Sequence, residues 1–259
     1  MKQIIFFDID STLYSHTSKC VPESTLMALE KLKEKGKLLF IATSRSFAEI
    51  TNLPQNLMDM MDGLICEGGA KVFYHNKVII EHTMEELGKH RLIQLLNDSN
   101  LAFRYCGLGK DINYLDHAAT YAFKRFNELY EMIPPVKKYT NQPLTHILFY
   151  CFDDGLVNQI SNQIPSLEFI QLQTAFEATA KGVTKGSALK QVCAYLNIPV
   201  AHSVCFGDSA NNIEMIKQSG LGIAMGNGAK CVQRVADYVT SDIDDNGIYN
   251  ACVHFNWFD

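Results

Sequence analysis

The 259-residue chain lacks the sequence features of a disulfide-stabilised, zinc-binding or membrane-spanning protein. Its eight cysteines include no CxxC pair, and most stand among apolar neighbours, so we expect buried free thiols. No apolar stretch approaches the roughly 20 residues that a membrane span requires. Acids follow only a short apolar run at the N-terminus, which a signal peptide would not show. These absences predict a cytoplasmic protein in a reducing compartment.

The chain also lacks a basic excess. Its formal net charge of −5 and its pI near 5.9 argue against a general nucleic-acid or membrane-surface binder. It has no internal repeat and no low-complexity tract. With 47% hydrophobic and 20% charged residues, it is an ordinary globular chain, long enough for one large or two modest domains. The expected partner is therefore a small molecule, and the oligomeric state is left open.

Strand and helix patterns alternate at both ends of the chain. The predicted strands are 4–7, 38–42, 64–66, 203–206 and 221–224, and the predicted helices are 22–35, 185–196, 211–218 and 229–235. A hairpin is expected after residue 66, where glycines precede β-branched residues. Alternation of this kind is typical of a parallel sheet covered by helices on both faces.

The middle of the chain has a different character and ends in two predicted strands, 167–173 and 175–180, that no helix separates. Its predicted helices are 84–99, 117–133 and 156–164, and its predicted strands are 101–106, 146–152, 167–173 and 175–180. We therefore expect a doubly wound parallel, Rossmann-like core formed by residues 1–81 and 182–259. An α+β cap domain, residues 82–181, is expected as an insertion in that core.

Polar side chains follow the predicted core strands at their carboxyl ends, where open α/β sheets bind ligands. Asp8 and Asp10 come directly after the first strand, Thr43 follows the second, and Asp208 follows a later strand. Lys185 begins a helix that leads back into the core. Alone, each has an ordinary explanation: a solvated strand end, a turn or helix N-cap, or a surface lysine. Together, carboxylates, a hydroxyl and an ammonium suit Mg²⁺ and a phosphate group.

Four segments carry a resemblance to a known family. The stretch DIDST, the Thr43 strand end, Lys185 within KGVTKGSAL, and GDSANN resemble, in order and spacing, the four motifs of the haloacid dehalogenase superfamily. The insertion between the second and third motifs resembles the large α/β cap of its Cof-type phosphatases. The resemblance spans essentially the whole chain, and four ordered motifs are more specific than any one of them.

The resemblance implies chemical roles for five residues. Asp8 would attack phosphorus and form an aspartyl-phosphate. Asp10 would protonate the leaving alcohol and then activate water. Thr43 and the backbone N–H of Ser44 would hold a phosphoryl oxygen, and Lys185 would offset negative charge on Asp8 and on the phosphate. The two acids would then share one side of the strand because both act in the same reaction.

The resemblance also implies a Mg²⁺ site. Its ligands would be the side chains of Asp8 and Asp208 and the backbone carbonyl of Asp10, with Asn211 and Asn212 in the outer shell. The family's last motif usually ends in Asp where this chain has Asn212. An amide can accept a hydrogen bond from a metal-bound water but has one negative charge fewer, so we expect weaker Mg²⁺ binding. On this view Asn212→Asp would strengthen it, unless the added carboxylate repelled the neighbouring acids.

Three other positions depart from the family pattern. Ser11 and Ser44 stand where glycine is usual, and both could crowd the phosphate pocket. Gly68 stands where asparagine is usual, which removes a polar contact near the substrate. Two functions are therefore weighed. The first is a Mg²⁺-dependent phosphatase of small phosphate monoesters, with sugar phosphates the leading candidates. The second is a weakly active or inactive phosphometabolite-binding regulatory protein; retention of both Asp8 and Asp10 favours the enzyme.

Substrate selection is expected to depend on cap residues that face the core. Exposed helix charges are the alternative explanation for most of the candidates, which are Arg104, Tyr105, Lys110, Tyr114, Arg125 and Lys138. The cap is expected to move, because such chemistry benefits from excluding water and the product must still leave. The predicted hinges lie near residues 81–84 and 180–183.

Overall fold

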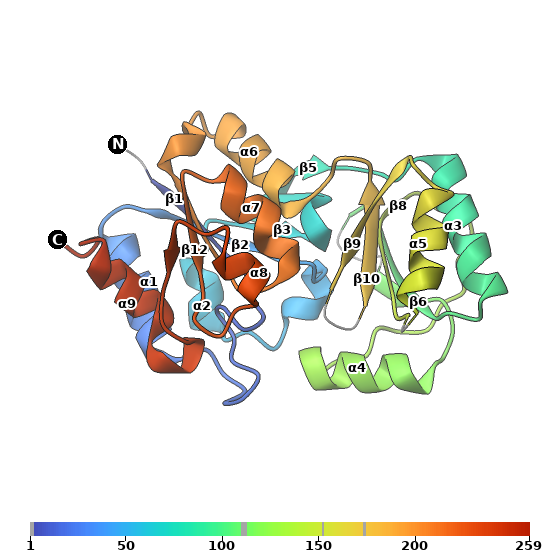
Figure 1. Cartoon of the computed structure of the whole chain (residues 1–259), viewed down its shortest axis with the longest axis horizontal. Coiled ribbons are helices and arrows are strands. Elements are labelled where there is room, and N and C mark those ends of the chain that lie inside the picture. The colour runs from blue at the N-terminus through green and yellow to red at the C-terminus, as the bar shows by residue number, and fades with distance from the viewer. Residues whose placement is uncertain (1–2, 110–112, 152, 173–174) are drawn as a thin grey trace.

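The computed structural model describes residues 3–109, 113–151, 153–172 and 175–259, which form two β-sheets (Figure 1). The larger, here called the core sheet, has the strand order β13-β12-β11-β1-β2-β3-β4-β5. Strands β13 to β3 in this order pair in parallel, and β4 and β5 add an antiparallel hairpin at one edge. The strands are β1 (Ile4–Phe7), β2 (Leu38–Ala42), β3 (Gly63–Cys66), β4 (Lys71–Tyr74), β5 (Lys77–Glu81), β11 (Ser203–Gly207), β12 (Leu221–Ala224) and β13 (Tyr238–Val239).

Helices cover both faces of the core sheet because alternate side chains of its buried strands point to opposite sides. In β1, Ile5 and Phe7 pack on one face and Ile4 and Phe6 on the other, all four fully buried. The first face is covered by α1 (Glu23–Glu34), α2 (Gln55–Met60) and α9 (Gly247–His254), and the second by α6 (Lys185–Tyr195), α7 (Ile213–Gln218) and α8 (Lys230–Gln233).

The smaller sheet, here called the cap sheet, is antiparallel, with the order β7-β6-β8-β10-β9. Helices α3 and α5 pack on one face, and α4 lies against the other (Figure 1). Its elements are α3 (Glu86–Asp98), β6 (Phe103–Gly107), β7 (Asn113–Leu115), α4 (Thr120–Tyr130), β8 (Leu144–Phe149), α5 (Asp154–Asn162), β9 (Leu167–Gln171) and β10 (Phe176–Ala180).

The prediction of a doubly wound parallel core with an inserted α+β region is confirmed. The sequence patterns missed the short elements α2, β7, β13 and α9. The helix predicted over 211–218 begins as a 3₁₀ turn, Ala210–Asn212, because the Asn212 side chain turns back onto the Ser209 N–H. No helix among the described residues is long and apolar enough to cross a membrane.

The strand order brings three loops together. Strand β1 lies between β2 and β11, with Phe7 in register with Ile41 on one side and Phe206 on the other. The residues that follow these three strands therefore meet at one edge of the core sheet. The cap sheet stands beside this edge (Figure 1).

Candidate active site

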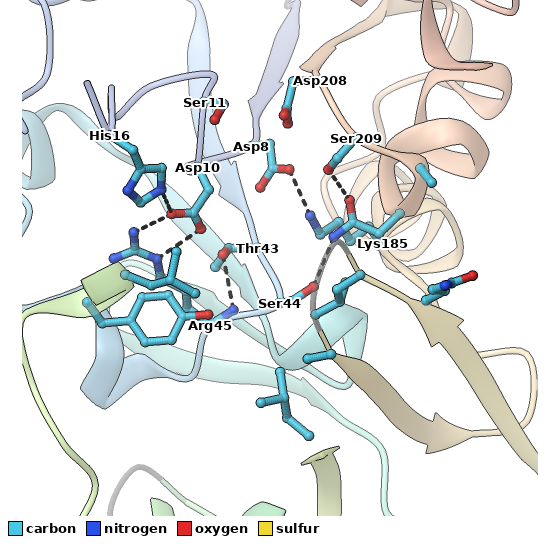
Figure 2. Close-up of a pocket in the computed structure, with 18 of the residues that line it drawn as sticks. Asp8, Asp10, Ser11, His16, Thr43, Ser44, Arg45, Lys185, Asp208 and Ser209 are labelled. Carbon is cyan, nitrogen blue, oxygen red and sulfur yellow. Dashed lines mark hydrogen bonds and ion pairs between the residues drawn. The ribbon is translucent and has the colours of Figure 1, made fainter. Parts of the chain in front are cut away.

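A cavity of about 380 Å³ lies at the carboxyl edge of the core sheet, between it and the cap sheet (Figure 2). The structure brings together seven of the eight residues that the sequence predicted for the site. These residues line the cavity and are Asp8, Asp10, Thr43, Ser44, Lys185, Asp208 and Asn211. Asn212, the eighth, is fully buried behind the cavity wall.

Asp8 stands at the end of β1 and is almost fully buried. Its backbone N–H extends the sheet by donating to the Phe206 carbonyl at 3.1 Å. Its Oδ2 lies 3.1 Å from Lys185 Nζ and accepts a hydrogen bond from Asn212 Nδ2 at 2.7 Å. Its Oδ1 accepts from the Ile9 N–H at 2.8 Å. These donors fix the orientation of the carboxylate at the cavity wall.

Asp208, after β11, lies beside Asp8 (Figure 2). Burial and the neighbouring Asp8 carboxylate raise the pKa of Asp208 well above its usual range, although Lys185 opposes this. Its Oδ1 is buried and has no hydrogen-bond partner in the part of the chain that the structure describes. Two adjacent buried carboxylates, one with an unpaired oxygen, fit a cation.

The donor set fits Mg²⁺ better than a transition metal. Among the described residues, no group of three or more His, Cys, Asp or Glu is placed to hold a metal ion. Mg²⁺ commonly uses only one or two carboxylates and completes its octahedron with water and substrate phosphate oxygens. Asp8 and Asp208 can supply those carboxylates.

The Asn212 side chain links Asp8 to the backbone of Asp208. Its Oδ1 accepts hydrogen bonds from the backbone N–H groups of Asp208 and Ser209, both at 3.0 Å, while its Nδ2 donates to Asp8. A carboxylate at this position could not donate, since it has only acceptors. The amide therefore contacts Asp8 directly, and its outer-shell role toward a metal stays a prediction.

Asp10 is held by two cationic or potentially cationic groups (Figure 2). The Arg45 guanidinium donates to Oδ1 at 2.6 Å and to Oδ2 at 3.1 Å, and His16 Nε2 lies 2.8 Å from Oδ1. Burial raises the pKa of Asp10, but the charge of Arg45 and the hydrogen bonds from His16 and Arg45 outweigh it and hold the pKa well below its usual range. Asp10 is therefore a carboxylate in this state.

The loop after β2 is tied to the loop after β11. Thr43 Oγ1 accepts a hydrogen bond from the Arg45 N–H at 3.1 Å, so the hydroxyl caps a turn as well as facing the cavity. Ser44 Oγ accepts from Asn211 Nδ2 at 3.2 Å, and Asn211 Oδ1 accepts from Ser209 Oγ at 2.6 Å. The hydroxyl of Ser44, where glycine is usual in the resembled motif, thus joins the two loops.

Lys185 is not a surface lysine, because only 2% of its side chain is exposed. It opens α6, whose N-cap Thr184 accepts a hydrogen bond from the Ser187 N–H at 3.0 Å. The backbone at Gly69 comes so close to the start of α6 that a Cβ at position 69 would lie 2.2 Å from the Thr184 carbonyl oxygen. This close approach fixes the helix start that carries the ammonium to Asp8.

The backbone takes a left-handed conformation at two of the positions that depart from the family pattern. Ser11 has φ +59°, in the left-handed region that favours glycine, so its serine carries some backbone strain. Gly68 also lies in this region, at φ +64°, and a Cβ there would lie 3.0 Å from Glu177 Oε2 on β10. The carboxylate of Glu177, from the cap sheet, therefore occupies the space that a side chain at position 68 would need.

The cap wall of the cavity is mostly apolar. Its lining residues from the cap sheet and α4 are Arg125, Leu129, Tyr130, Leu148, Tyr150, Gln171, Leu172 and Ala175. Cap and core also touch at its edge, where the Arg45 guanidinium lies 4.6 Å from the centre of the Tyr130 ring. Tyr14 Oη donates to Glu131 Oε1 at 3.2 Å beside it.

One of the six cap candidates lines the cavity, namely Arg125. Arg104 is instead fully buried against Glu49. Tyr105 faces away from the core, with its hydroxyl donating to the Lys137 carbonyl at 2.7 Å. Neither Tyr114 nor Lys138 is among the lining residues, and Lys110 lies outside the described residues.

Sequence reasoning missed Arg45 and His16, the partners of Asp10. Arg45 follows Thr43-Ser44 within the same strand end, so a basic residue at that point could have been matched to the nearby acids. His16 carries no signal beyond lying six residues after Asp10. The residues of the apolar cap wall carry no such sequence signal, because in the sequence they look like ordinary core residues of a helix and of three strand ends.

Comparisons with known proteins agree with this geometry. A family model described as haloacid dehalogenase-like hydrolase matches residues 5–252. Phosphatase YwpJ of Bacillus subtilis is 28% identical over 290 residues, covering 97% of this chain and 99% of that protein. The 5-amino-6-(5-phospho-D-ribitylamino)uracil phosphatase YcsE of the same organism is 24% identical over 257 residues, covering 98% and 95%.

Among solved structures, a haloacid dehalogenase subclass IIB sugar phosphatase superposes with a TM-score of 0.92 at 27% identity. The alignment covers 99% of this chain and 100% of that one. The resemblance to Cof-type phosphatases is thereby confirmed, as is the prediction of a phosphatase. The family match over nearly the whole chain, on a site that joins two buried acids, a lysine and a hydroxyl loop, shows that the protein belongs to the haloacid dehalogenase-like hydrolases.

Proposed function

We propose that the protein is a Mg²⁺-dependent phosphatase of small phosphate monoesters that works through an aspartyl-phosphate intermediate. The observation that carries the proposal is the fixed carboxylate of Asp8 at the cavity wall, beside Lys185 and the orphaned oxygen of Asp208. A phosphate bound at this point would meet a nucleophile, an ammonium and a cation site together. That combination is what transfer of a phosphoryl group needs.

In the first half of the reaction, Asp8 attacks phosphorus and the bond from phosphorus to the ester oxygen breaks. Thr43 and the Ser44 N–H bind a phosphoryl oxygen, and Lys185 offsets the charge. The leaving oxygen takes a proton from Asp10. Since Arg45 and His16 favour the carboxylate form of Asp10, the proton must be taken up as the substrate enters.

In the second half, Asp10 is already in the form that its two partners favour. As a carboxylate it accepts a proton from water, the water oxygen attacks phosphorus, and the bond to Asp8 breaks. The products are inorganic phosphate and the original Asp8. When bound by Asp8, Asp208 and the Asp10 carbonyl, Mg²⁺ supplies positive charge that stabilises the transferring phosphoryl group.

Sugar phosphates are the substrate class that we propose first. The subclass IIB sugar phosphatase with a TM-score of 0.92 supports this. The cavity volume of about 380 Å³ suits a metabolite-sized ester. A non-hydrolysing phosphometabolite-binding protein is the second candidate, which the loss of a carboxylate at Asn212 favours.

We also propose that residues 1–81 and 182–259 form a core domain and residues 82–181 a cap domain, with hinges near 81–84 and 180–183. The two separate sheets support this division. A cytoplasmic location is part of the same proposal, and the eight free thiols are consistent with it.

Release of phosphate from para-nitrophenyl phosphate, with and without Mg²⁺, tests the function. We expect turnover that depends on Mg²⁺ and is lost in Asp8→Asn, which keeps the shape of the side chain but is a poor nucleophile. Asp62→Asn is a matched control, since that carboxylate binds Lys33 away from the cavity. Turnover that survives in Asp8→Asn would refute the covalent mechanism, and phosphate binding without turnover in the wild-type protein would favour the regulatory alternative.

A further inference from the structure

A buried ion pair joins the cap sheet to the loop that carries the phosphate-binding groups. Arg104 on β6 and Glu49, in the 3₁₀ turn Phe47–Ile50 after β2, are both fully buried. Arg104 Nε lies 3.0 Å from Glu49 Oε1, and one terminal nitrogen donates to Oε2 at 3.0 Å. One contact is a charged hydrogen bond and the other a close ion pair, and together they hold the two side chains against each other.

The pair supports the backbone of the phosphate-binding loop from behind. Glu49 Oε2 also accepts a hydrogen bond from the Ser46 N–H at 2.8 Å. Arg104 reaches the Ser44 carbonyl oxygen at 3.4 Å. Both contacts are to the main chain within three residues of Thr43. Thr43 and Ser44 line the cavity and Arg104 does not, so Arg104 can act on the proposed phosphate-binding groups, the Thr43 hydroxyl and the Ser44 N–H, without touching a ligand.

The cap sheet continues the hydrogen-bonded chain beyond Arg104. The other terminal nitrogen of Arg104 donates a hydrogen bond to Nδ1 of His146, on β8, at 2.8 Å. An arginine can only donate, so His146 is an acceptor at Nδ1 and carries its proton at Nε2. That nitrogen lies 3.0 Å from Glu177 Oε2, and Glu177 fills the space that a side chain at position 68 would need. The chain from Glu49 to Glu177 thus spans the boundary between core and cap.

We propose that Arg104 is a positioning residue through which the seated cap holds the phosphate-binding loop in its working geometry. The inference rests on the proposed function of that loop. It assigns to Arg104 a part in catalysis that differs from substrate recognition, the role for which the sequence made it one of six candidates. It also makes phosphate affinity depend on whether the cap sheet is seated on the core.

A loss of stability must be separated from a loss of positioning. Arg104→Met leaves Glu49 as an unpaired buried charge, which destabilises the fold regardless of any role in catalysis. In the double variant Arg104→Met/Glu49→Gln both charges are absent, and the glutamine oxygen can still accept from the Ser46 N–H. Arg91→Met, on the exposed surface of α3, is the matched control.

The measurements are the thermal midpoint and the calorimetric dissociation constant of inorganic phosphate in the presence of Mg²⁺, for each protein. We expect the double variant to regain most of the midpoint lost in Arg104→Met while phosphate binding stays about 10-fold weaker than in the wild type, the size of effect expected for a lost charged hydrogen bond. Arg91→Met should match the wild type in both. Restoration of phosphate affinity in the double variant, or normal affinity in Arg104→Met, would overturn the proposal.

Because phosphate binding is measured without turnover, the outcome is independent of the proposed reaction. A wild-type protein that binds phosphate but releases none from an ester would count against the phosphatase and leave the Arg104 test intact. For any variant with turnover, weaker positioning should also raise KM for para-nitrophenyl phosphate, while Arg104→Lys, which keeps one charge, should recover part of the loss.

Discussion

The two walls of the cavity are built from different chemistry. The core wall carries the acids Asp8 and Asp10, a buried lysine and a hydroxyl loop, each fixed by at least one hydrogen bond or ion pair shorter than 3.3 Å. The cap wall is mainly apolar, with Arg125 and Gln171 among leucine, tyrosine and alanine side chains. Rigid polar groups suit a reaction that is common to all substrates, whereas shape and apolar contact suit selection among them. We therefore propose that the core wall serves catalysis and the cap wall serves recognition.

This division makes a general prediction. Changes in the core wall should reduce turnover by a similar factor for every phosphate ester. Changes in the cap wall should alter the ranking of esters and leave the metal requirement unchanged. The following experiments test it, from the largest expected effect to the smallest.

Asp10→Asn should reduce turnover by roughly 10²–10⁴, the usual contribution of a positioned proton donor. The amide can still accept from Arg45, so Mg²⁺ and phosphate should bind nearly as in the wild type. Turnover of three esters of different size, compared with calorimetric phosphate binding, measures the effect. An equal loss of phosphate binding and of turnover would indicate that Asp10 has a structural role instead.

Asn212→Asp should raise the half-saturating Mg²⁺ concentration by about 10-fold, within the range known for groups around metal ligands. The variant loses the donor that contacts Asp8 at 2.7 Å and places a second carboxylate there, so a shared proton would compete with the metal. This direction is opposite to the one expected from sequence, which assumed that the side chain faces a metal-bound water.

Titration of activity against Mg²⁺ decides between the two directions for position 212. Asn250→Asp adds the same charge on an exposed part of α9 and should leave the titration unchanged. A lower half-saturating Mg²⁺ concentration in Asn212→Asp would instead support the outer-shell role of this residue.

Mg²⁺ binding should weaken as the pH falls. The pKa of Asp208 is raised by burial and by Asp8, so this carboxyl keeps its proton to a higher pH than an ordinary aspartate. The metal needs the carboxylate, so a proton must leave on binding, and the affinity can fall by up to about 10-fold per pH unit below the pKa. Calorimetric titration of Mg²⁺ in two buffers of different ionisation enthalpy counts the released protons. A count of zero near neutral pH would contradict this.

Leu129→Ala on α4 should change the relative kcat/KM values of small and bulky esters by a few-fold to about 10-fold, as expected when methylene groups leave an apolar pocket. The Mg²⁺ requirement should stay the same. Leu87→Ala on α3 is the matched control, since that leucine is 78% exposed. A uniform loss for all esters after Leu129→Ala would break the proposed division between the walls.

The same two walls show how far the sequence can predict this protein. The core wall was predictable because strand ends fall at fixed places along the chain, and parallel neighbours bring those ends to one edge. Asp8, Thr43 and Asp208 needed only the strand positions and their order. Arg45 and His16 were missed because pairing with Asp10 depends on side-chain direction, which periodicity does not give.

The cap wall was not predictable in the same way. Arg104 was one of six candidates for facing the substrate, which the sequence could not rank, and its ion pair with Glu49 allows it to be fully buried instead. Leu148 and Tyr150 have the pattern of core residues, and they line the cavity because α4 covers only part of that face. Recognition surfaces made by helix and sheet together have no local signal.

The position of β1 between β2 and β11 has a consequence for synthesis on the ribosome. Ile4 is in register with Ser203, so the strand that carries Asp8 lacks one neighbour until most of the chain has been made. The cap sheet uses only strands between Phe103 and Ala180, and its contacts are closer in sequence. Since nearby contacts form faster than distant ones, we expect the cap sheet to fold before the core sheet is complete. Catalytic competence would then be acquired only near the end of translation.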